Sequence, residues 1–342
     1  MYRLKIGVYL PCFRQRMGSN IKKDIIKKDI VRFFNAYGLK EYYMVLKHYS
    51  LSAKGVGKPM LMAVVDNRRK TKGLTDRFKG IVSVYALAKA NGVPFRCIFN
   101  HPMELTDFLI PNTYDWMPKL SELSESVWDV RFRIMSKQPP LRRLTNLFPL
   151  KKQVLVYAKV DYLDKINKKY NQQYQWGRLF NELFKPTKIL EDQLHLHRSR
   201  MGGDAYIACV FRFQNLLGDF KEYHFKPLQP TDQRALLTRN VNALRSISEQ
   251  SDVPVLVTSD SATFISAVKD LKNIYTIPGK VVHIDNVSDA ESNVYLKSFV
   301  DFFMLSRAQK IYSLGTDIMY KTDFPKYAAK VHDIPFERIL VR

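Results

Sequence analysis

The residue with the most evident chemical potential is Arg212, which directly follows a short apolar segment. Residues 205–211 read AYIACVF after a Gly-Gly-Asp turn, and such a run predicts a strand buried on both faces of a parallel sheet. Ligand crevices in open α/β sheets lie beyond the carboxyl ends of the strands, so Arg212 is expected to face a binding site. Its permanently charged, planar guanidinium suits a phosphate group. The alternative is a structural arginine that pairs with Asp219 or another carboxylate.

A second strand end carries Asp260. The apolar residues 253–257 predict a buried strand, TSDS follows at 258–261, and a helix is expected at 262–271. Asp260 therefore lies between a strand end and a helix start. There it either belongs to a site or serves as the N-cap of the helix.

A third candidate is the loop that contains Gly73. A strand is predicted at residues 59–65, a polar loop follows, and a helix is expected from Asp76 to about residue 90. The N-terminus of a helix in such a βα unit can hold an anion or sugar hydroxyls. Asp76 is then an acidic group of the site or a favourable charge in the first helical turn.

His195 and His197 form an H-x-H pair. This spacing would bring both rings to one face of a strand, but a helix is expected at 187–200 and points them in different directions. No third ligand is nearby in the sequence, so no metal site is predicted.

Alternating helices and strands account for the rest of the chain. Thr231 or Asp232 is expected to cap the helix at 230–250. Further helices are predicted at 21–37, 161–174, 176–184, 293–307 and 323–331, and further strands at 5–10, 93–99, 154–157, 281–284 and 310–313.

The composition indicates a folded protein of two ordinary domains. The chain has 342 residues, 46% of them apolar, with 21 Phe and 19 Tyr to fill its cores. Cys12, Cys97 and Cys209 form no C-x-x-C pair and are expected to be free thiols in a reducing compartment. No apolar run reaches the roughly 18–20 residues of a membrane span, and no signal peptide is recognised, so a cytoplasmic location is predicted.

The formal net charge of +23 is large. Nucleic acid, an anionic membrane surface or a phosphate-bearing substrate would each explain it. The basic residues are spread along the chain, which is also typical of solvated basic faces.

The sequence resembles the O-fucosyltransferase-like enzymes in separated stretches that occur in the family's order. RFQNLLGDF at 212–220 is similar to the plant-type arginine motif and to the His-x-Arg-Arg-Gly-Asp form of bacterial fucosyltransferases. In the family this arginine contacts the diphosphate of GDP-fucose, so the resemblance implies that role for Arg212, with Phe213 and Asn215 beside it. The family's histidine two residues earlier is Val210 here, and its nucleotide contact is not carried over.

The second stretch, GLTDRFKGI at 73–81, resembles the Gly-Leu-x-Asn-Gln loop and the plant-type Gly-Leu-Asn-Gln-Gln-Arg-x-Gly frame. Either Thr75 or Asp76 stands where the family has asparagine. The resemblance implies that Gly73, Thr75 and Arg77 face the sugar, and that Asp76 is a carboxylate on the acceptor side.

Two further motifs belong to the same resemblance. The Ser-Asp pair at 259–260 implies that Asp260 hydrogen-bonds the guanine base, flanked by Ser259 and Ser261. Residues 298–331 are similar to the last family motif, in which a Ser-rich loop and a helix meet the diphosphate. Here that loop carries Thr322 in the serine place, followed by Asp323 and Phe324, and Lys321 is expected to offset the charge of the aspartate.

The resemblance implies a GT-B fold, with two Rossmann-like α/β domains facing a cleft. Residues 1–200 are expected to form the acceptor side, with the irregular stretch at 101–152 shaping it. Residues 201–342 are expected to bind the GDP-sugar, with the last helix crossing back.

The implied reaction is inverting transfer of fucose from GDP-fucose to a glycan hydroxyl, in bacterial-type surface polysaccharide synthesis. Arg212 would stabilise the charge that develops on the departing diphosphate. The chain has no Asp-x-Asp motif, so metal-independent transfer without a cofactor is expected. Asp76, Asp219 and Glu222 are the candidates for a general base.

Two other classes stay open. One is a related transferase that uses another sugar nucleotide. The other is a protein that binds nucleic acid or another polyanion, for which residues 113–152 come nearest to a basic patch with interleaved aromatics. No specific nucleic-acid partner is expected, whereas peripheral contact with an anionic membrane would use the same positive charge.

Overall fold

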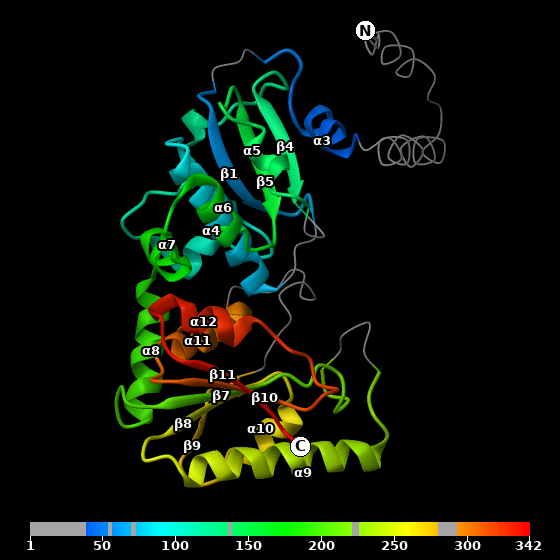
Figure 1. Cartoon of the computed structure of the whole chain (residues 1–342), viewed down its shortest axis with the longest axis vertical. Coiled ribbons are helices and arrows are strands. Elements are labelled where there is room, and N and C mark those ends of the chain that lie inside the picture. Colours follow the sequence, from blue (N-terminus) through cyan, green and yellow to red (C-terminus); the bar gives the residue numbers. More distant parts are fainter. Residues whose placement is uncertain (1–38, 54–56, 70–72, 136–138, 221–225, 280–292) are drawn as a thin grey trace.

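The computed structural model describes residues 39–53, 57–69, 73–135, 139–220, 226–279 and 293–342. Within them the chain forms two parallel sheets, one above the other in Figure 1. The helix predicted at 21–37 and the strands predicted at 5–10 and 281–284 lie outside the described residues.

The N-terminal sheet has four strands in the order β2-β1-β5-β4, all parallel to their neighbours. Its central strand β1 is buried along its whole length, as the unbroken apolar sequence MLMAVV requires. A small antiparallel pair, β3 with β6, lies outside this sheet. The strands are β1 (Met60–Val65), β2 (Phe95–Phe99), β3 (Leu109–Pro111), β4 (Val130–Met135), β5 (Gln153–Ala158) and β6 (Phe184–Pro186).

The C-terminal sheet has five parallel strands in the order β11-β10-β7-β8-β9. The predicted strand at 205–211 is its central strand β7, so the prediction of a strand buried on both faces is confirmed. The strands are β7 (Ile207–Phe211), β8 (Val255–Ser259), β9 (Ile274–Thr276), β10 (Ile311–Gly315) and β11 (Phe336–Leu340).

Helices cover both sheets. In Figure 1, α8 runs along one side of the molecule from the upper sheet to the lower, and α11 and α12 lie between the two sheets. The helices are α3 (Lys40–His48), α4 (Leu74–Ala90), α5 (Arg142–Thr145), α6 (Leu163–Tyr170), α7 (Trp176–Leu183), α8 (Lys188–Arg200), α9 (Pro230–Glu249), α10 (Ala262–Val268), α11 (Asn293–Ser306) and α12 (Phe324–His332).

One apolar core joins the two halves. Phe78 of α4 contacts the ring of Phe302 of α11 at 5.4 Å between centroids, and Trp176 of α7 contacts Tyr327 of α12 at 5.0 Å. Gly177 makes the second contact possible, because a Cβ there would run into the backbone carbonyl of Lys330. The last helix therefore packs on the N-terminal half before the chain returns to the lower sheet as β11.

Most predicted elements are confirmed, and three details differ. Helix α4 begins at Leu74, two residues before the predicted start. The prediction that Thr231 or Asp232 caps α9 is wrong, because the helix begins at Pro230 with Gln229 as the N-cap residue. Strands β3, β4, β6, β9 and β11 and helices α3 and α5 were missed: β3, β4 and α5 lie inside the stretch interpreted as irregular, and β11 follows the helix predicted to be last.

Candidate active site

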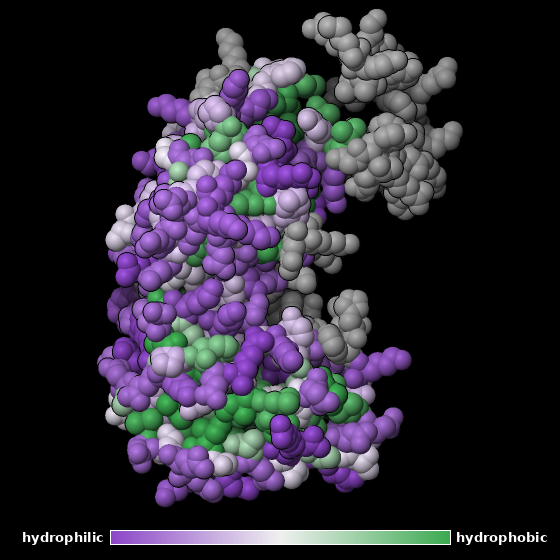
Figure 2. All heavy atoms as spheres, in the orientation of Figure 1, coloured by the Kyte–Doolittle hydropathy of each residue, from purple (hydrophilic) through white to green (hydrophobic). Residues whose placement is uncertain are grey.

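The site is defined by the crossover in the C-terminal sheet. Strand β7 lies between β10 on one side and β8 on the other, so the chain reverses its winding direction between β7 and β10. Ligands of open α/β sheets bind at such a switch point, outside the carboxyl ends of the strands. In Figure 1 these ends point away from α8, and Figure 2 shows the molecule hollowed between its halves on that same side.

Arg212 begins the loop that leaves β7 at this edge. Its Nη1 lies 2.9 Å from Oδ2 of Asp260, and its guanidinium carbon lies 4.9 Å from the ring centroid of Phe220. The side chain is 19% exposed. Two groups from different loops thus fix the plane of the guanidinium. Arg212 therefore pairs with a carboxylate, as the alternative prediction stated, and this carboxylate is Asp260.

Asp260 holds this loop together. Its Oδ1 accepts a hydrogen bond from the backbone N–H of Phe213 at 2.8 Å, and its Oδ2 accepts one from Gln214 at 2.7 Å. Gln214 has a φ of 54°, in the left-handed region, so the chain turns sharply at this residue. Burial raises the pKa of Asp260, while Arg212 and the two N–H groups act in the opposite direction. The carboxylate side chain is only 2% exposed, so its function in this structure is to organise the loop.

The N-cap of α10 is the neighbouring serine and not Asp260. The hydroxyl of Ser261 accepts a hydrogen bond from the N–H of Phe264 at 3.0 Å. Asp219 supports the same helix start, since its Oδ2 accepts hydrogen bonds from the hydroxyl of Ser261 and the N–H of Thr263. Ser259 is buried and accepts a hydrogen bond from the N–H of Ser261.

The loop before α12 carries a second charged group. Oδ2 of Asp323 lies 2.7 Å from Nζ of Lys79, and Oδ1 lies 3.3 Å from Nη2 of Arg338. Burial alone would raise the pKa of Asp323, but the hydrogen bond and charge of Lys79 outweigh it, so the pKa is lowered. Lys79 and Arg338 thus compensate the negative charge of Asp323, a role that was expected for Lys321. Thr322 accepts a hydrogen bond from the N–H of Phe324 at 3.2 Å, which shapes the turn into the helix.

Lys79 links this loop to the N-terminal half. It lies on α4, is 11% exposed at its side chain, and pairs with Asp76 at 3.1 Å as well as with Asp323. Its Nζ also lies 4.8 Å from the ring centroid of Tyr327. The carboxylate of Asp76 is therefore engaged with Lys79 within α4, and the second pair of Lys79, with Asp323, connects the two halves of the protein.

The remaining predicted residues of α4 differ in their exposure. Gly73 precedes the helix, and a Cβ added there would meet no atom within 4 Å. Thr75 is buried, and its hydroxyl has no hydrogen-bond partner among the residues that the structure describes. Arg77 is only 2% exposed and points into the protein, where it donates to the carbonyl of His101 at 2.8 Å and lies over the ring of Phe99. The structure thus brings Asp76, but not the guanidinium of Arg77, toward the loop before α12.

Neither metal ligation nor a membrane span has support in the described part of the chain. His197 is buried on α8 with its Nδ1 2.7 Å from the hydroxyl of Tyr275, while His195 is exposed on the same helix. Across the residues that the structure describes, no group of three or more His, Cys, Asp or Glu side chains could hold an ion. Likewise, none of the helices described here is long and apolar enough to cross a membrane.

Sequence reasoning missed Phe220 and Lys79 as parts of the site. Phe220 lies at the end of the arginine motif, and an aromatic residue at such an apolar position is more often part of the hydrophobic core than of a binding site. Lys79 lies three residues after Asp76, the spacing of a helical ion pair, which is the one signal that pointed to it.

The fold has counterparts among solved structures. An arginine-to-lysine variant of Arabidopsis thaliana FUT1 in complex with GDP matches with a TM-score of 0.54 and 13% identity, over 87% of this chain and 73% of that chain. NodZ alpha-1,6-fucosyltransferase, an enzyme from Bradyrhizobium, soaked with GDP-fucose, matches with a TM-score of 0.51 and 12% identity, over 80% of this chain and 93% of that chain. POFUT1 in complex with GDP-fucose matches with a TM-score of 0.50 and 10% identity, over 85% of this chain and the whole of that chain.

The sequence itself matches no protein-family model and no curated protein. Two parallel Rossmann-like sheets with a hollow between them define a GT-B fold. Within that class the chain has the fucosyltransferase-like form of the fold, so the expected fold is confirmed.

Proposed function

We propose that the protein is a glycosyltransferase that transfers fucose from GDP-fucose to a glycan hydroxyl with inversion. The observation that carries this proposal is an arginine held in place at the switch point of a fucosyltransferase-like fold. Arg212 is fixed by Asp260 at 2.9 Å and by the ring of Phe220. The arginine motif and the fold support the same assignment independently.

The chemistry follows from the charge that develops during transfer. As the bond between the sugar and the diphosphate breaks, the sugar gains oxocarbenium character and negative charge builds on the departing diphosphate. A guanidinium that is already oriented stabilises this charge without further reorganisation, and therefore lowers the barrier. Asp260 is a positioning residue in this account, because its oxygens accept the N–H groups of Phe213 and Gln214 and pair with Arg212.

The acceptor side is assigned to the N-terminal half, around the start of α4 and Gly73. A Cβ added at Gly73 would meet none of the described atoms within 4 Å, which supports this assignment. Asp76 and Asp219 are the candidate bases among the described residues, and each already has partners: Lys79 for Asp76, and Ser261 with Thr263 for Asp219. Glu222, the third candidate, lies outside the described residues. Because both described carboxylates are already engaged, the leaving diphosphate is a further candidate for the group that accepts the proton of the acceptor hydroxyl.

One observation favours a second candidate, a GT-B transferase for another sugar nucleotide. A carboxylate that reads guanine needs oxygens facing the base, whereas those of Asp260 are buried and occupied by the loop. Guanine would then be read by backbone groups, or a different base would be bound.

The test is transfer of labelled sugar from GDP-fucose, GDP-mannose, UDP-glucose and UDP-galactose to a panel of glycans. Product from GDP-fucose alone, absent in Arg212→Ala, supports the proposal. Product from a UDP-sugar alone supports the second candidate. No transfer from any donor, in a protein that circular dichroism shows to be folded, would overturn both.

A further inference from the structure

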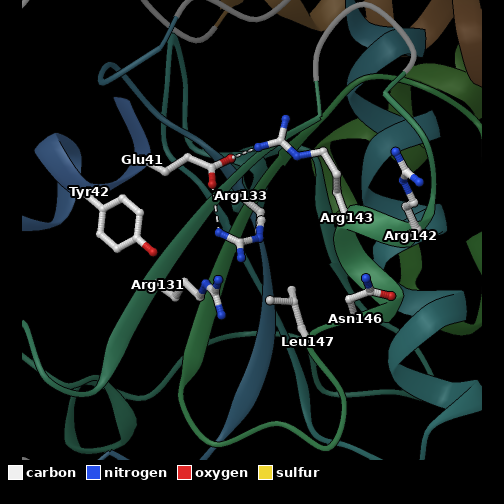
Figure 3. A pocket seen from close by; sticks show the side chains of 8 residues that line it. All are labelled: Glu41, Tyr42, Arg131, Arg133, Arg142, Arg143, Asn146 and Leu147. Atoms are coloured by element: carbon white, nitrogen blue, oxygen red, sulfur yellow. Dashed lines mark hydrogen bonds and ion pairs between the residues drawn. The ribbon is translucent and has the colours of Figure 1, made fainter. Parts of the chain in front are cut away.

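A basic pocket lies at the edge of the N-terminal sheet, on elements that carry none of the active-site residues. It is an open pocket of about 410 Å³ between α3, the edge strand β4 and the segment around α5. Four arginines line it, namely Arg131, Arg133, Arg142 and Arg143 (Figure 3). They come from two separate segments: Arg133 and Arg143 meet at the carboxylate of Glu41, and Arg131 and Arg142 line the pocket apart from this cluster (Figure 3).

Glu41 builds the inner wall of this pocket. Its Oε2 lies 2.7 Å from Nη1 of Arg133, and its Oε1 lies 2.7 Å from Nη2 of Arg143. Oε1 also accepts a hydrogen bond from the N–H of Ile134 at 2.8 Å, and so satisfies a donor of the strand β4, which is the edge of this sheet among the described residues. The carboxylate thus fixes two guanidinium groups and the strand edge together.

The charges in the pocket do not balance. Four guanidinium groups face one carboxylate, so three positive charges are uncompensated within the lining. Arg131 and Arg142 are exposed and have no ion-pair partner among the residues that the structure describes. Arg133 is only 11% exposed at its side chain; burial lowers its pKa, Glu41 opposes this, and Arg131 and Arg143 lower the pKa further.

A solvated basic face would not have this form. Arginines on such a face point singly into water, whereas these line one concavity and include a nearly buried member, Arg133, whose like-charged neighbours raise its free energy. An anion in the pocket removes that repulsion. The lining therefore has the properties of an anion site whose inner pair is fixed before the ligand arrives.

We propose that this pocket binds a phosphomonoester carried by a molecule of about the size of a sugar. A guanidinium group can donate two parallel hydrogen bonds to two oxygens of one phosphate. The ~1.5 to 2 negative charges of a phosphomonoester match the charge of Arg131 and Arg142, which have no ion-pair partner among the described residues. The volume falls in the range of small-molecule sites, roughly 300–1,000 Å³, and exceeds the need of a lone ion. Tyr42 and Asn146 supply a ring and an amide for the organic part. The proposal does not depend on the fucosyl-transfer assignment.

The experiment is a calorimetric titration of the full chain with glucose 6-phosphate, and with glucose as the neutral probe, at physiological salt. The pocket variant is R131Q/R142Q, which leaves the Glu41 cluster intact. The control variant is R234Q/R239Q, which removes the same charge from exposed positions on α9. We expect glucose 6-phosphate to bind and glucose not to bind. The pocket variant should lose affinity at least about tenfold, because charge-assisted hydrogen bonds are removed, while the control variant should bind like the wild type.

A second arm separates a soluble ligand from a lipid headgroup. Vesicles with phosphatidic acid carry a phosphomonoester, and vesicles of equal surface charge with phosphatidylserine do not. Preference for phosphatidic acid that is lost in R131Q/R142Q identifies a headgroup as the source, whereas binding of glucose 6-phosphate alone identifies a soluble ligand. The proposal is overturned if neither phosphomonoester binds, or if R234Q/R239Q weakens binding as much as R131Q/R142Q does. Unchanged GDP binding in the pocket variant keeps this outcome separate from that of the donor site.

Discussion

Two arginines in comparable places have opposite environments. Arg212 follows β7 at the carboxyl edge of its sheet, and Arg77 lies in the first turns of α4, which follows β1 at the carboxyl edge of the other sheet. Arg212 is held by Asp260 and Phe220 with part of its side chain exposed, whereas Arg77 is almost fully buried against Phe99 and the carbonyl of His101.

The contacts of each arginine determine whether its guanidinium group is accessible to a ligand. A carboxylate at the neighbouring strand end holds Arg212 at the sheet edge, while a backbone carbonyl and an aromatic ring hold Arg77 inside the fold. We therefore propose that Arg212 is a binding group and Arg77 a packing group, although both match the family frame at an arginine. The contrast predicts loss of function with the fold retained at Arg212, and loss of stability with function retained at Arg77.

The largest effect is expected for Arg212→Ala. Removal of the guanidinium should lower transfer at least about 10²–10³-fold, because a preorganised charge opposite the diphosphate is lost. The fold should persist, since Asp260 keeps the two N–H groups of Phe213 and Gln214. The measurement is the transfer rate together with the unfolding midpoint, with Arg234→Ala on α9 as the matched control. Normal turnover in Arg212→Ala would show that Arg212 does not take part in the transfer.

The next effect is expected for Asp260→Ala. The variant removes the acceptor of two buried peptide N–H groups and the carboxylate that pairs with Arg212, so we expect a loss of about 3–5 kcal/mol in the free energy of unfolding. Urea unfolding measures this loss. Asp260→Asn keeps one acceptor oxygen and should lose less. A variant as stable as the wild type would show that the carboxylate does not organise the loop.

Arg77→Met tests whether Arg77 contributes to stability and not to nucleotide binding. The substitution keeps most of the apolar volume but removes the hydrogen bond to His101 and the contact of the charge with Phe99. We expect a loss of about 2 kcal/mol in the free energy of unfolding, with unchanged affinity for GDP in the folded fraction. A fall in GDP affinity at unchanged stability would place Arg77 in the site instead.

The smallest effect is expected for Lys79→Met, which removes the link between Asp76 and Asp323. Both carboxylates keep access to solvent, so the loss in unfolding free energy should stay near 1 kcal/mol or below. Its dependence on salt separates an ion pair from packing: the difference from the wild type should shrink as the salt concentration rises. A difference that is independent of salt would assign the effect to the contact with Tyr327.

Local sequence signals predicted the elements better than the partners of charged residues. The strand at 207–211 and the helix at 74–90 follow from apolar runs and periodicity. The pairing of Arg212 with Asp260 joins positions 48 residues apart through adjacent parallel strands, and that register is set only when the sheet forms. Strand β4 was missed because VRFRIM alternates arginine with apolar residues at a sheet edge, which resembles an irregular basic segment until its neighbour β5 is in place.

The proposed reaction requires that Arg212 binds the diphosphate of a nucleotide sugar. Its most direct test is a calorimetric titration of the wild type and of Arg212→Ala with GDP, UDP and ADP, each with and without magnesium. The account predicts selective GDP binding that does not need magnesium and that weakens by about 100-fold in the variant, as expected for the loss of a charge-assisted fork to phosphate. Equal GDP affinity in the two proteins, or no binding of any nucleotide by the wild type, would contradict it.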